Sequence, residues 1–257
     1  KNTHQTLVFF NNGSQGKERF GPGLATDWKF VDDTHIIMNL RKDVYFNDGK
    51  KTPMTADDVK FTLDMAMKNV IKSALAGYVK STVKDKYQIE IEISSYNNEF
   101  IQSLSSVPLS IQSKKAYDDG VKEPWLIGTG PYKYDKWVQG EYCRLTKVKD
   151  YWGNNLPATD NFAPGVSDII EFRPMIEASA RVMALQAGEI DVCVNPPISD
   201  LKFLKDDKNI TVYEQPGTRL FYFAFNVEKK PWDNQKLRQA VACAIDKKSV
   251  LDAALNG

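Results

Sequence analysis

The sequence is poor in histidine, in cysteine and in charge of one sign. Its 257 residues include only two histidines and three cysteines, and 34 basic residues face 33 acidic ones, for a formal net charge of +1. Such balance, without a long basic run, argues against nucleic-acid binding. No apolar run reaches the roughly 18 residues that a transmembrane helix needs. The first residues, 1–4, also lack the hydrophobic region of a signal peptide.

The three cysteines predict free thiols. Cys143, Cys193 and Cys243 are widely separated, odd in number and without C-x-x-C spacing, so neither a zinc site nor a disulfide scaffold is indicated. Cys143 and Cys193 lie in strand-like stretches and Cys243 on an apolar helix face, which predicts buried free thiols. One disulfide stays open as an alternative, and no metal or cofactor is expected.

Known catalytic motifs are also missing. No G-x-S-x-G, H-E-x-x-H or Walker pattern occurs. We expect His4 at a frayed terminus and His35 on a strand. Residues 128–131, Gly-Thr-Gly-Pro, lack the Lys-Ser/Thr ending of a phosphate-binding loop and lead into a strand, so they predict a backbone crossover. A non-enzymatic protein is favoured, although a carboxylate-only hydrolase such as a glycosidase stays open.

What the first half does contain is clear strand and turn patterning. Residues 34–41 form a β-branched and apolar run entered through Asp32-Asp33, which predicts one arm of a hairpin. A second short strand over 44–46 should stop at Asp48-Gly49, because glycine supplies the positive φ of a tight turn. Residues 87–93 alternate apolar and polar side chains, which predicts a strand with one solvated face.

A helix should begin after Thr55. The hydroxyl of Thr55 can accept from the amide of Asp58, whose carboxylate can reach back, as in a capping box. The apolar residues that follow at helical spacing predict a buried face: Val59, Leu63, Ala66, Met67 and Val70. Asp57 and Asp58 therefore serve capping and solvation and not catalysis. Another short helix is predicted over residues 98–104.

The second half alternates predicted strands and helices. The strands are expected at 168–172, 190–194 and 219–225, the last so apolar that it should lie at the centre of a sheet. Helices are expected at 177–187, ended by Gly188, after Asn234 and after Asp246. The short links between these elements predict a mixed, partly parallel sheet.

Several stretches together resemble one family of proteins. The carrying residues are Leu24-Ala25-x-x-Trp28, residues 40–49, Thr55-Ala56-Asp57-Asp58-Val59, residues 128–132, Tyr151-Trp152-Gly153, residues 184–191, Phe225-Asn226 and residues 231–247. In this order they are similar to the signature blocks of the bacterial extracellular solute-binding proteins of family 5, which deliver oligopeptides, dipeptides or nickel to ABC importers. The resemblance spans nearly the whole chain.

The resemblance implies a fold as well as a class. It is an α/β fold with mixed α+β sheets, the periplasmic-binding-protein-like type II, cluster C architecture. Residues 1–127 would hold the accessory subdomain with the strand entering it, and residues 128–257 a partial main lobe, most of lobe one. The second lobe would be absent, so the chain is expected to be a fragment that binds weakly or not at all alone.

The resemblance also implies a function without chemistry. A substrate-binding component of an ABC importer holds its solute, here expected to be a short peptide, between two lobes and delivers it to the permease subunits. The ligand-binding residues would be Asn195, Thr218, Leu220 and Tyr222, at the exits of central strands. Such proteins are periplasmic or extracellular, free or anchored by lipid. A nickel chelate is the alternative solute, but residues 69–78 and 107–117 lack the arginines that the nickel branch uses.

Overall fold

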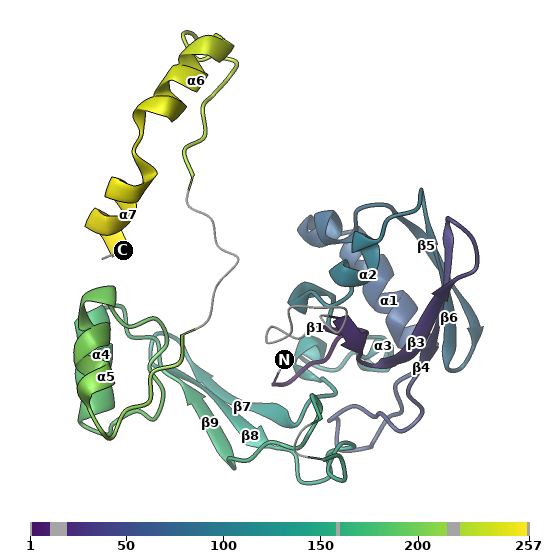
Figure 1. Cartoon of the computed structure of the whole chain (residues 1–257). Coiled ribbons are helices and arrows are strands. Elements are labelled where there is room, and N and C mark those ends of the chain that lie inside the picture. The colour runs from purple at the N-terminus through teal and green to yellow at the C-terminus, as the bar shows by residue number, and fades with distance from the viewer. Residues whose placement is uncertain (1, 11–19, 158–159, 215–221, 256–257) are drawn as a thin grey trace. The chain divides into compact units, whose positions relative to one another are not determined.

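A computed structural model of the chain describes residues 2–10, 20–157, 160–214 and 222–255. The chain forms two compact units, Lys1–Pro174 and Met175–Gly257. Figure 1 shows the strands gathered in the first unit, and the second unit built from helices and extended segments. No helix within the described ranges combines the length and apolar character needed to cross a membrane.

The first unit contains a four-stranded antiparallel sheet in the order β3-β4-β6-β5. Its strands are β3 (Ala25–Phe30), β4 (His35–Leu40), β5 (Tyr78–Asp85) and β6 (Gln88–Ile93). The predicted hairpin arm and the alternating strand are both confirmed, because β4 and β6 bury every second residue. Glu90 and Glu92 lie on the partly exposed face, where they pair with Lys84 and Lys80.

Helix α1 (Ala56–Met67) packs against this sheet. Val59, Leu63 and Ala66 are almost fully buried, as the helical spacing predicted. The carboxylate of Asp58 accepts from the backbone N–H of Thr55 at 2.8 Å and from its hydroxyl at 3.0 Å. Burial raises the pKa of Asp58, and these hydrogen bonds oppose the rise. The predicted cap is therefore present, and Asp58 is structural.

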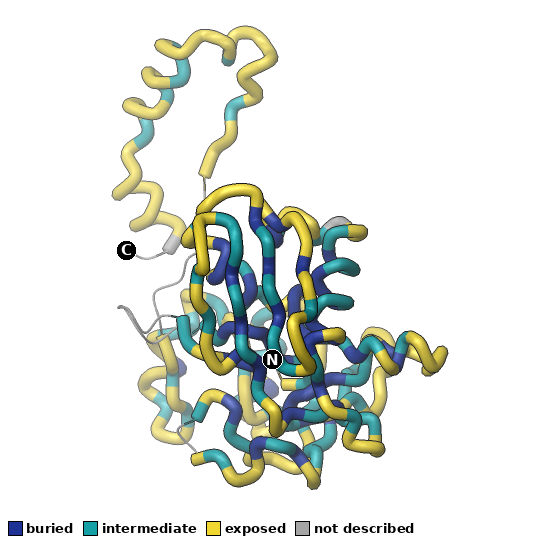
Figure 2. The backbone as a smooth tube through the Cα atoms, turned by 90° about the vertical axis from the view of Figure 1, so that its right-hand side faces the viewer, coloured by how far each residue is buried: buried dark blue, intermediate teal, exposed yellow. Residues whose placement is uncertain are grey.

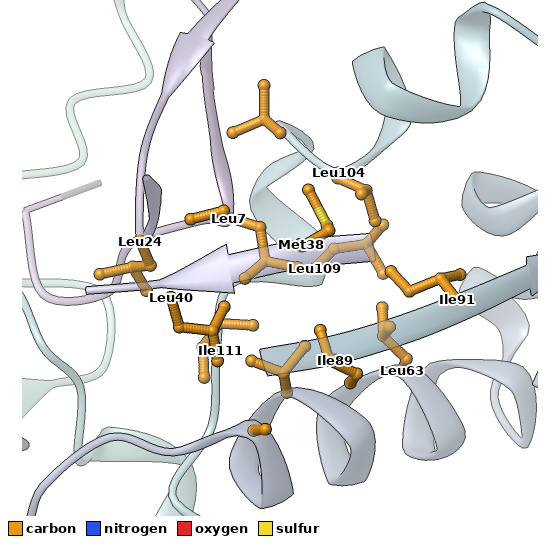
Figure 3. Close-up of a cluster of buried hydrophobic side chains, with 14 of the residues drawn as sticks. Leu7, Leu24, Met38, Leu40, Leu63, Ile89, Ile91, Leu104, Leu109 and Ile111 are labelled. Atoms are coloured by element: carbon orange, nitrogen blue, oxygen red, sulfur yellow. The ribbon is translucent and has the colours of Figure 1, made fainter. Parts of the chain in front are cut away.

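A single hydrophobic cluster joins the sheet, α1 and the strand-forming start of the chain. Figure 3 shows Leu63 of α1 facing Ile89 and Ile91 of β6, with Leu7 and Met38 close by. Burying each such side chain stabilises the fold by about 1.5–3 kcal/mol. This cluster is the main core of the described chain.

The remaining elements of the first unit are short. One small sheet is an antiparallel pair of strands, β1 (Val8–Phe10) and β2 (Phe20–Pro22). Another is an antiparallel sheet of three strands, β7 (Tyr132–Val138), β8 (Tyr142–Lys147) and β9 (Ile169–Phe172). The short helices are η2 (Val70–Leu75), α2 (Glu99–Ser103), η3 (Val107–Leu109), α3 (Lys114–Asp118) and η4 (Pro124–Leu126). Strand β9 and helix α2 confirm two predictions, whereas the strand predicted at 44–46 is reduced to a single bridge between Tyr45 and Pro53.

The second unit contains α4 (Ala178–Gln186), η5 (Ile198–Asp200), α5 (Leu201–Asp206), α6 (Gln235–Ala244) and α7 (Lys247–Leu255). The N-caps predicted for the last two helices are confirmed. The side chain of Asn234 accepts from the N–H of Lys236 at 2.9 Å, and that of Asp246 accepts from the N–H of Lys248 at 3.0 Å.

The strands predicted at 190–194 and 219–225 do not form among the described residues. Residues 190–194 have no strand structure, nor do residues 222–225, while residues 219–221 lie outside the described chain. A strand needs neighbouring backbone groups as hydrogen-bond partners, and no described segment pairs with either stretch. Every described strand pair is antiparallel. Because the strands predicted at 190–194 and 219–225 do not form among the described residues, the partly parallel sheet predicted for the second half is wrong for this part of the chain.

The apolar faces predicted for α6 and α7 are not buried. No residue of α6 is buried, and Val250 and Leu251 of α7 are about half exposed, at 54% and 50%. Figure 2 shows both helices coloured almost wholly as exposed or intermediate, in contrast to the strands of the first unit. The amphipathic spacing correctly predicted that α6 and α7 are helices. It did not predict their burial, because an apolar face is buried only where another element covers it.

Candidate functional site

The sequence-predicted ligand residues fall in the second unit. Asn195 and Tyr222 are described, whereas Thr218 and Leu220 lie outside the described residues. Asn195 and Tyr222 are both exposed. No hydrogen bond or ring contact connects these two side chains in the described part of the chain.

Asn195 occupies a loop whose backbone is held in an unusual conformation. Its φ angle is 52°, in the left-handed region, and Pro196 follows it. Asparagine tolerates this region better than most residues, and a following proline disfavours the right-handed helical alternative. The loop therefore presents an exposed amide side chain from a defined backbone position.

Helix α4 leads into this loop through a regular C-terminal cap. Gly188 has a φ of 72°; its N–H donates to the carbonyl of Leu185 at 3.1 Å, and the N–H of Glu189 donates to that of Ala184 at 2.9 Å. This is a Schellman motif, and it confirms the predicted glycine stop. The exit direction of the chain toward Asn195 is thereby set by local geometry.

Arg181 of α4 connects the residues just before the helix to Asn195 in the loop after it. The sequence analysis did not predict this role. Its Nη1 donates to the carbonyl oxygens of Met175 at 2.7 Å and Ile176 at 3.1 Å, and its Nη2 donates to that of Asn195 at 3.1 Å. The available signal was composition, because Arg181 is the only charged residue in α4. A lone arginine in a helix of small and apolar residues suggests a specific partner.

Tyr222 has no core role in the structure. It is 81% exposed and Phe223 is 80% exposed, which contradicts the expectation of a strand buried on both faces. The ring and hydroxyl of Tyr222 are thus accessible. They can offer an apolar surface and one hydrogen-bonding group to a ligand.

Two open depressions in the described part of the first unit are less suited to a ligand. The larger, about 550 Å³, lies along β4 and β6 and includes Asp27, Asn39 and Gln88. The amide of Asn39 donates to Asp27 at 2.6 Å and accepts from Gln88 at 2.8 Å, so the lining groups bind one another. The smaller, about 320 Å³, flanks α1 beside Lys60 and Asp64, which form an ion pair at 2.7 Å.

Residues 128–131 form a packing junction with the first residues of the chain and with Trp152. The N–H of Gly130 donates to the carbonyl of Thr3 at 2.9 Å, and the indole Nε1 of Trp152 donates to that of Thr129 at 2.8 Å. A Cβ on Gly128 would lie 2.0 Å from the oxygen of Thr3, so only glycine fits. This glycine pair serves chain packing.

His4 is not at a frayed terminus. It lies at this same junction, partly buried, with its Nε2 out of contact with solvent, and its Nδ1 is 3.0 Å from the hydroxyl of Thr3. Burial lowers its pKa to about 4. The side chain is neutral at pH 7 and belongs to the packing of the first unit.

The cysteines are free but not buried. Cys143 and Cys193 are partly exposed and Cys243 is exposed. The prediction of buried thiols is wrong because the strand expected around Cys193 and the covered helix face expected around Cys243 do not form. No group of three metal-ligating side chains comes together within the described residues.

Comparison with known proteins decides the family. The family model of the bacterial extracellular solute-binding proteins, family 5 Middle, matches residues 19–257. This chain belongs to that family. The family's mixed helix and sheet fold agrees with the structure described above.

The relatives of this family 5 chain include proteins that are 30% identical to it. Heme-binding protein A of Haemophilus influenzae aligns with 99% of the chain, and di/tripeptide-binding protein 1 of Pseudomonas aeruginosa aligns with 95%. In both cases the chain spans 49% of the relative, about half its length.

Solved structures give the same answer for the fold. The periplasmic binding protein DppA of Helicobacter pylori, in complex with the peptide STSA, matches all of the chain with a TM-score of 0.83 at 27% identity, and 53% of that protein is covered. NikA of Staphylococcus aureus, in complex with Ni(L-His)2, matches with a TM-score of 0.80 at 22% identity, over 100% of the chain and 51% of NikA. The second likeness concerns the fold alone.

Proposed function

We propose that this family 5 chain is part of the substrate-binding component of an ABC importer that captures a short peptide and delivers it unchanged to the permease subunits. The match to the family over residues 19–257 carries the proposal. The 30% identity to a di/tripeptide-binding protein supports a peptide as the solute. Such a protein acts by binding, and it acts in the periplasm or outside the cell, free or lipid-anchored.

The proposed site uses polar anchors and apolar walls. The Asn195 amide both donates and accepts, so it suits the backbone or the terminal carboxylate of a peptide. Tyr222 would supply a wall and a hydroxyl, and Thr218 and Leu220, which lie outside the described residues, are proposed as further ligand-binding residues on the resemblance alone. Closure of a second lobe over these residues would exclude water and strengthen each polar contact. Residues 1–127 would form the accessory subdomain and residues 128–257 the partial main lobe.

A peptide is preferred over a nickel chelate because of one feature of the sequence. The resemblance implies that the nickel branch grips the carboxylate groups of a metal chelate with arginines, and residues 69–78 and 107–117, which would supply them, contain no arginine. The likeness to the nickel-binding NikA, at 22% identity, supports only the shared fold. No comparable feature favours a hydrolase, because the relatives reported above are named for binding.

Calorimetry and thermal unfolding of the full natural-length protein test the proposal. The ligands are dialanine, trialanine, reduced glutathione, Ni(L-His)2 and heme, each titrated separately. A peptide at about 100 times its Kd should raise the free energy of unfolding by about 2.7 kcal/mol. Stabilisation by Ni(L-His)2 or heme and by none of the peptides would overturn the choice of solute.

A second measurement tests the absence of chemistry. Each peptide is incubated with the protein and recovered for mass spectrometry. The expected result is intact peptide, and cleavage products that vanish in an Asn195→Gly variant would show an enzyme.

Dialanine amide, which lacks the free carboxylate of dialanine, is the matched ligand that tests the proposed carboxylate contact. It should bind more weakly than dialanine.

A further inference from the structure

Arg181 connects the residues just before α4 to Asn195. Its guanidinium reaches three carbonyl oxygens, two just before α4 and one at Asn195, with distances between 2.7 and 3.1 Å. The planar fork of arginine suits such simultaneous donation, whereas the single ammonium of lysine does not. The carbonyl of Asn195 is engaged by this fork, and its side-chain amide is exposed with no hydrogen bond recorded within the described chain.

The left-handed backbone of Asn195 needs such support. Asparagine tolerates this region better than most residues other than glycine, but the conformation is still sparsely populated and persists when its surroundings fix it. Pro196 removes one alternative, and the carbonyl bond from Arg181 fixes the peptide plane that Asn195 shares with Pro196. The Schellman cap at Gly188 fixes the other end of the segment. Residues 189–195 are therefore held at both ends.

We infer that Arg181 is a positioning residue of the peptide site: it holds Asn195 in the left-handed form that presents the amide to the ligand. Arg181 acts through Asn195, and no contact of Arg181 with the peptide is implied. The inference rests on the proposed function, because it assigns Arg181 to the same site. Arg181 lies 14 positions before Asn195 in the sequence, although its guanidinium contacts the Asn195 carbonyl directly.

A thiol reporter tests the hold on the loop without any ligand. Cys193 is partly exposed and lies two residues before Asn195. In the full natural-length protein carrying Cys143→Ser and Cys243→Ser, the rate at which a water-soluble maleimide modifies the Cys193-containing peptide, followed by mass spectrometry, reports local opening of the loop. Arg181→Lys should raise this rate about fivefold or more, because opening exposes the thiol.

Arg238→Lys is the matched control. The Nη1 of Arg238 also donates to a carbonyl oxygen, that of Trp232 at 2.6 Å, in the same unit but away from the loop. It should leave the rate at Cys193 unchanged. An equal rate in wild-type and Arg181→Lys proteins, or equal increases in both arginine variants, would overturn the inference.

Peptide affinity separates positioning from general stability. With trialanine as the probe, Arg181→Lys should weaken binding about tenfold, and Arg181→Lys added to Asn195→Gly should weaken it no further, since the effect passes through the Asn195 side chain. Additive losses would overturn the inference. A wild-type protein that binds no peptide would overturn the proposed function instead, while the maleimide rates still decide whether Arg181 holds the loop.

Discussion

The carboxylate of Asp58 accepts a hydrogen bond from the backbone N–H of Lys114 at 2.9 Å, across 56 positions of sequence. The same carboxylate caps α1 through Thr55. Asp58 is only 5% exposed, so one buried charge joins the first turn of α1 to the first residue of α3. A residue that the sequence marks as a helix cap thus also fixes tertiary structure.

Asp58→Asn should lower the free energy of unfolding by about 2–3 kcal/mol, because charge-assisted hydrogen bonds are lost and a buried N–H is left poorly satisfied. Urea titration followed by far-UV circular dichroism measures the change. Asp57→Asn is the control, since Asp57 is an exposed acid in the same turn. Its effect should stay within about 0.5 kcal/mol, and equal losses in both variants would contradict the tertiary role.

His4 should make stability depend on pH. Its folded pKa of about 4 lies below its ordinary value of 6.5, so the unfolded chain binds the proton more readily. The stabilisation is complete above pH 6.5 and is lost as the pH falls toward 4, by at most about 3 kcal/mol at 1.36 kcal/mol per pKa unit. Urea midpoints at pH 4, 5, 6 and 7 measure it.

The two histidines permit a clean comparison for this pH effect. His4→Gln should reduce the loss of stability between pH 6.5 and 4. His35→Gln should not, because His35 is partly exposed and pairs with Asp32 at the surface. A wild-type pH profile in the His4→Gln variant would show that other groups cause the dependence.

Gly128→Ala should destabilise the first unit by about 3 kcal/mol or more, because overpacking against backbone cannot be relieved by a rotamer change. The new Cβ would meet the Thr3 oxygen at 2.0 Å. Thermal unfolding measures the loss. Gly21→Ala is the control, since nothing lies within 4 Å of its Cβ position, and a comparable loss there would refute the close-approach argument.

Gly188→Ala should cost about 1 kcal/mol, because its φ of 72° disfavours any side chain even though the surrounding space is open. The urea midpoint of the full natural-length protein should fall accordingly. Ala187→Gly is the comparison variant, because Ala187 occupies a right-handed position of the same cap. An unchanged midpoint for Gly188→Ala would argue against the Schellman cap as a stabilising feature.

Local structure followed from the sequence wherever neighbouring residues decide it. The alternation of residues 88–93 selected β6, Thr55 and Asp58 began α1, Asn234 and Asp246 began the last two helices, and Gly188 ended α4. Each of these depends on periodicity, on a capping oxygen or on the conformational freedom of glycine. The family also followed from the order of short motifs along the chain.

Long-range partners were decided only by the tertiary structure. Residues 190–194 and 222–225 have the composition of strands, yet a strand exists only where another backbone accepts and donates its hydrogen bonds. For the same reason the sequence did not reveal the hydrogen bond between Asp58 and Lys114, the packing of His4 against Gly128, or the hydrogen bond from Arg181 to Asn195. Sequence periodicity records which face of an element is apolar, but the three-dimensional packing determines what covers that face.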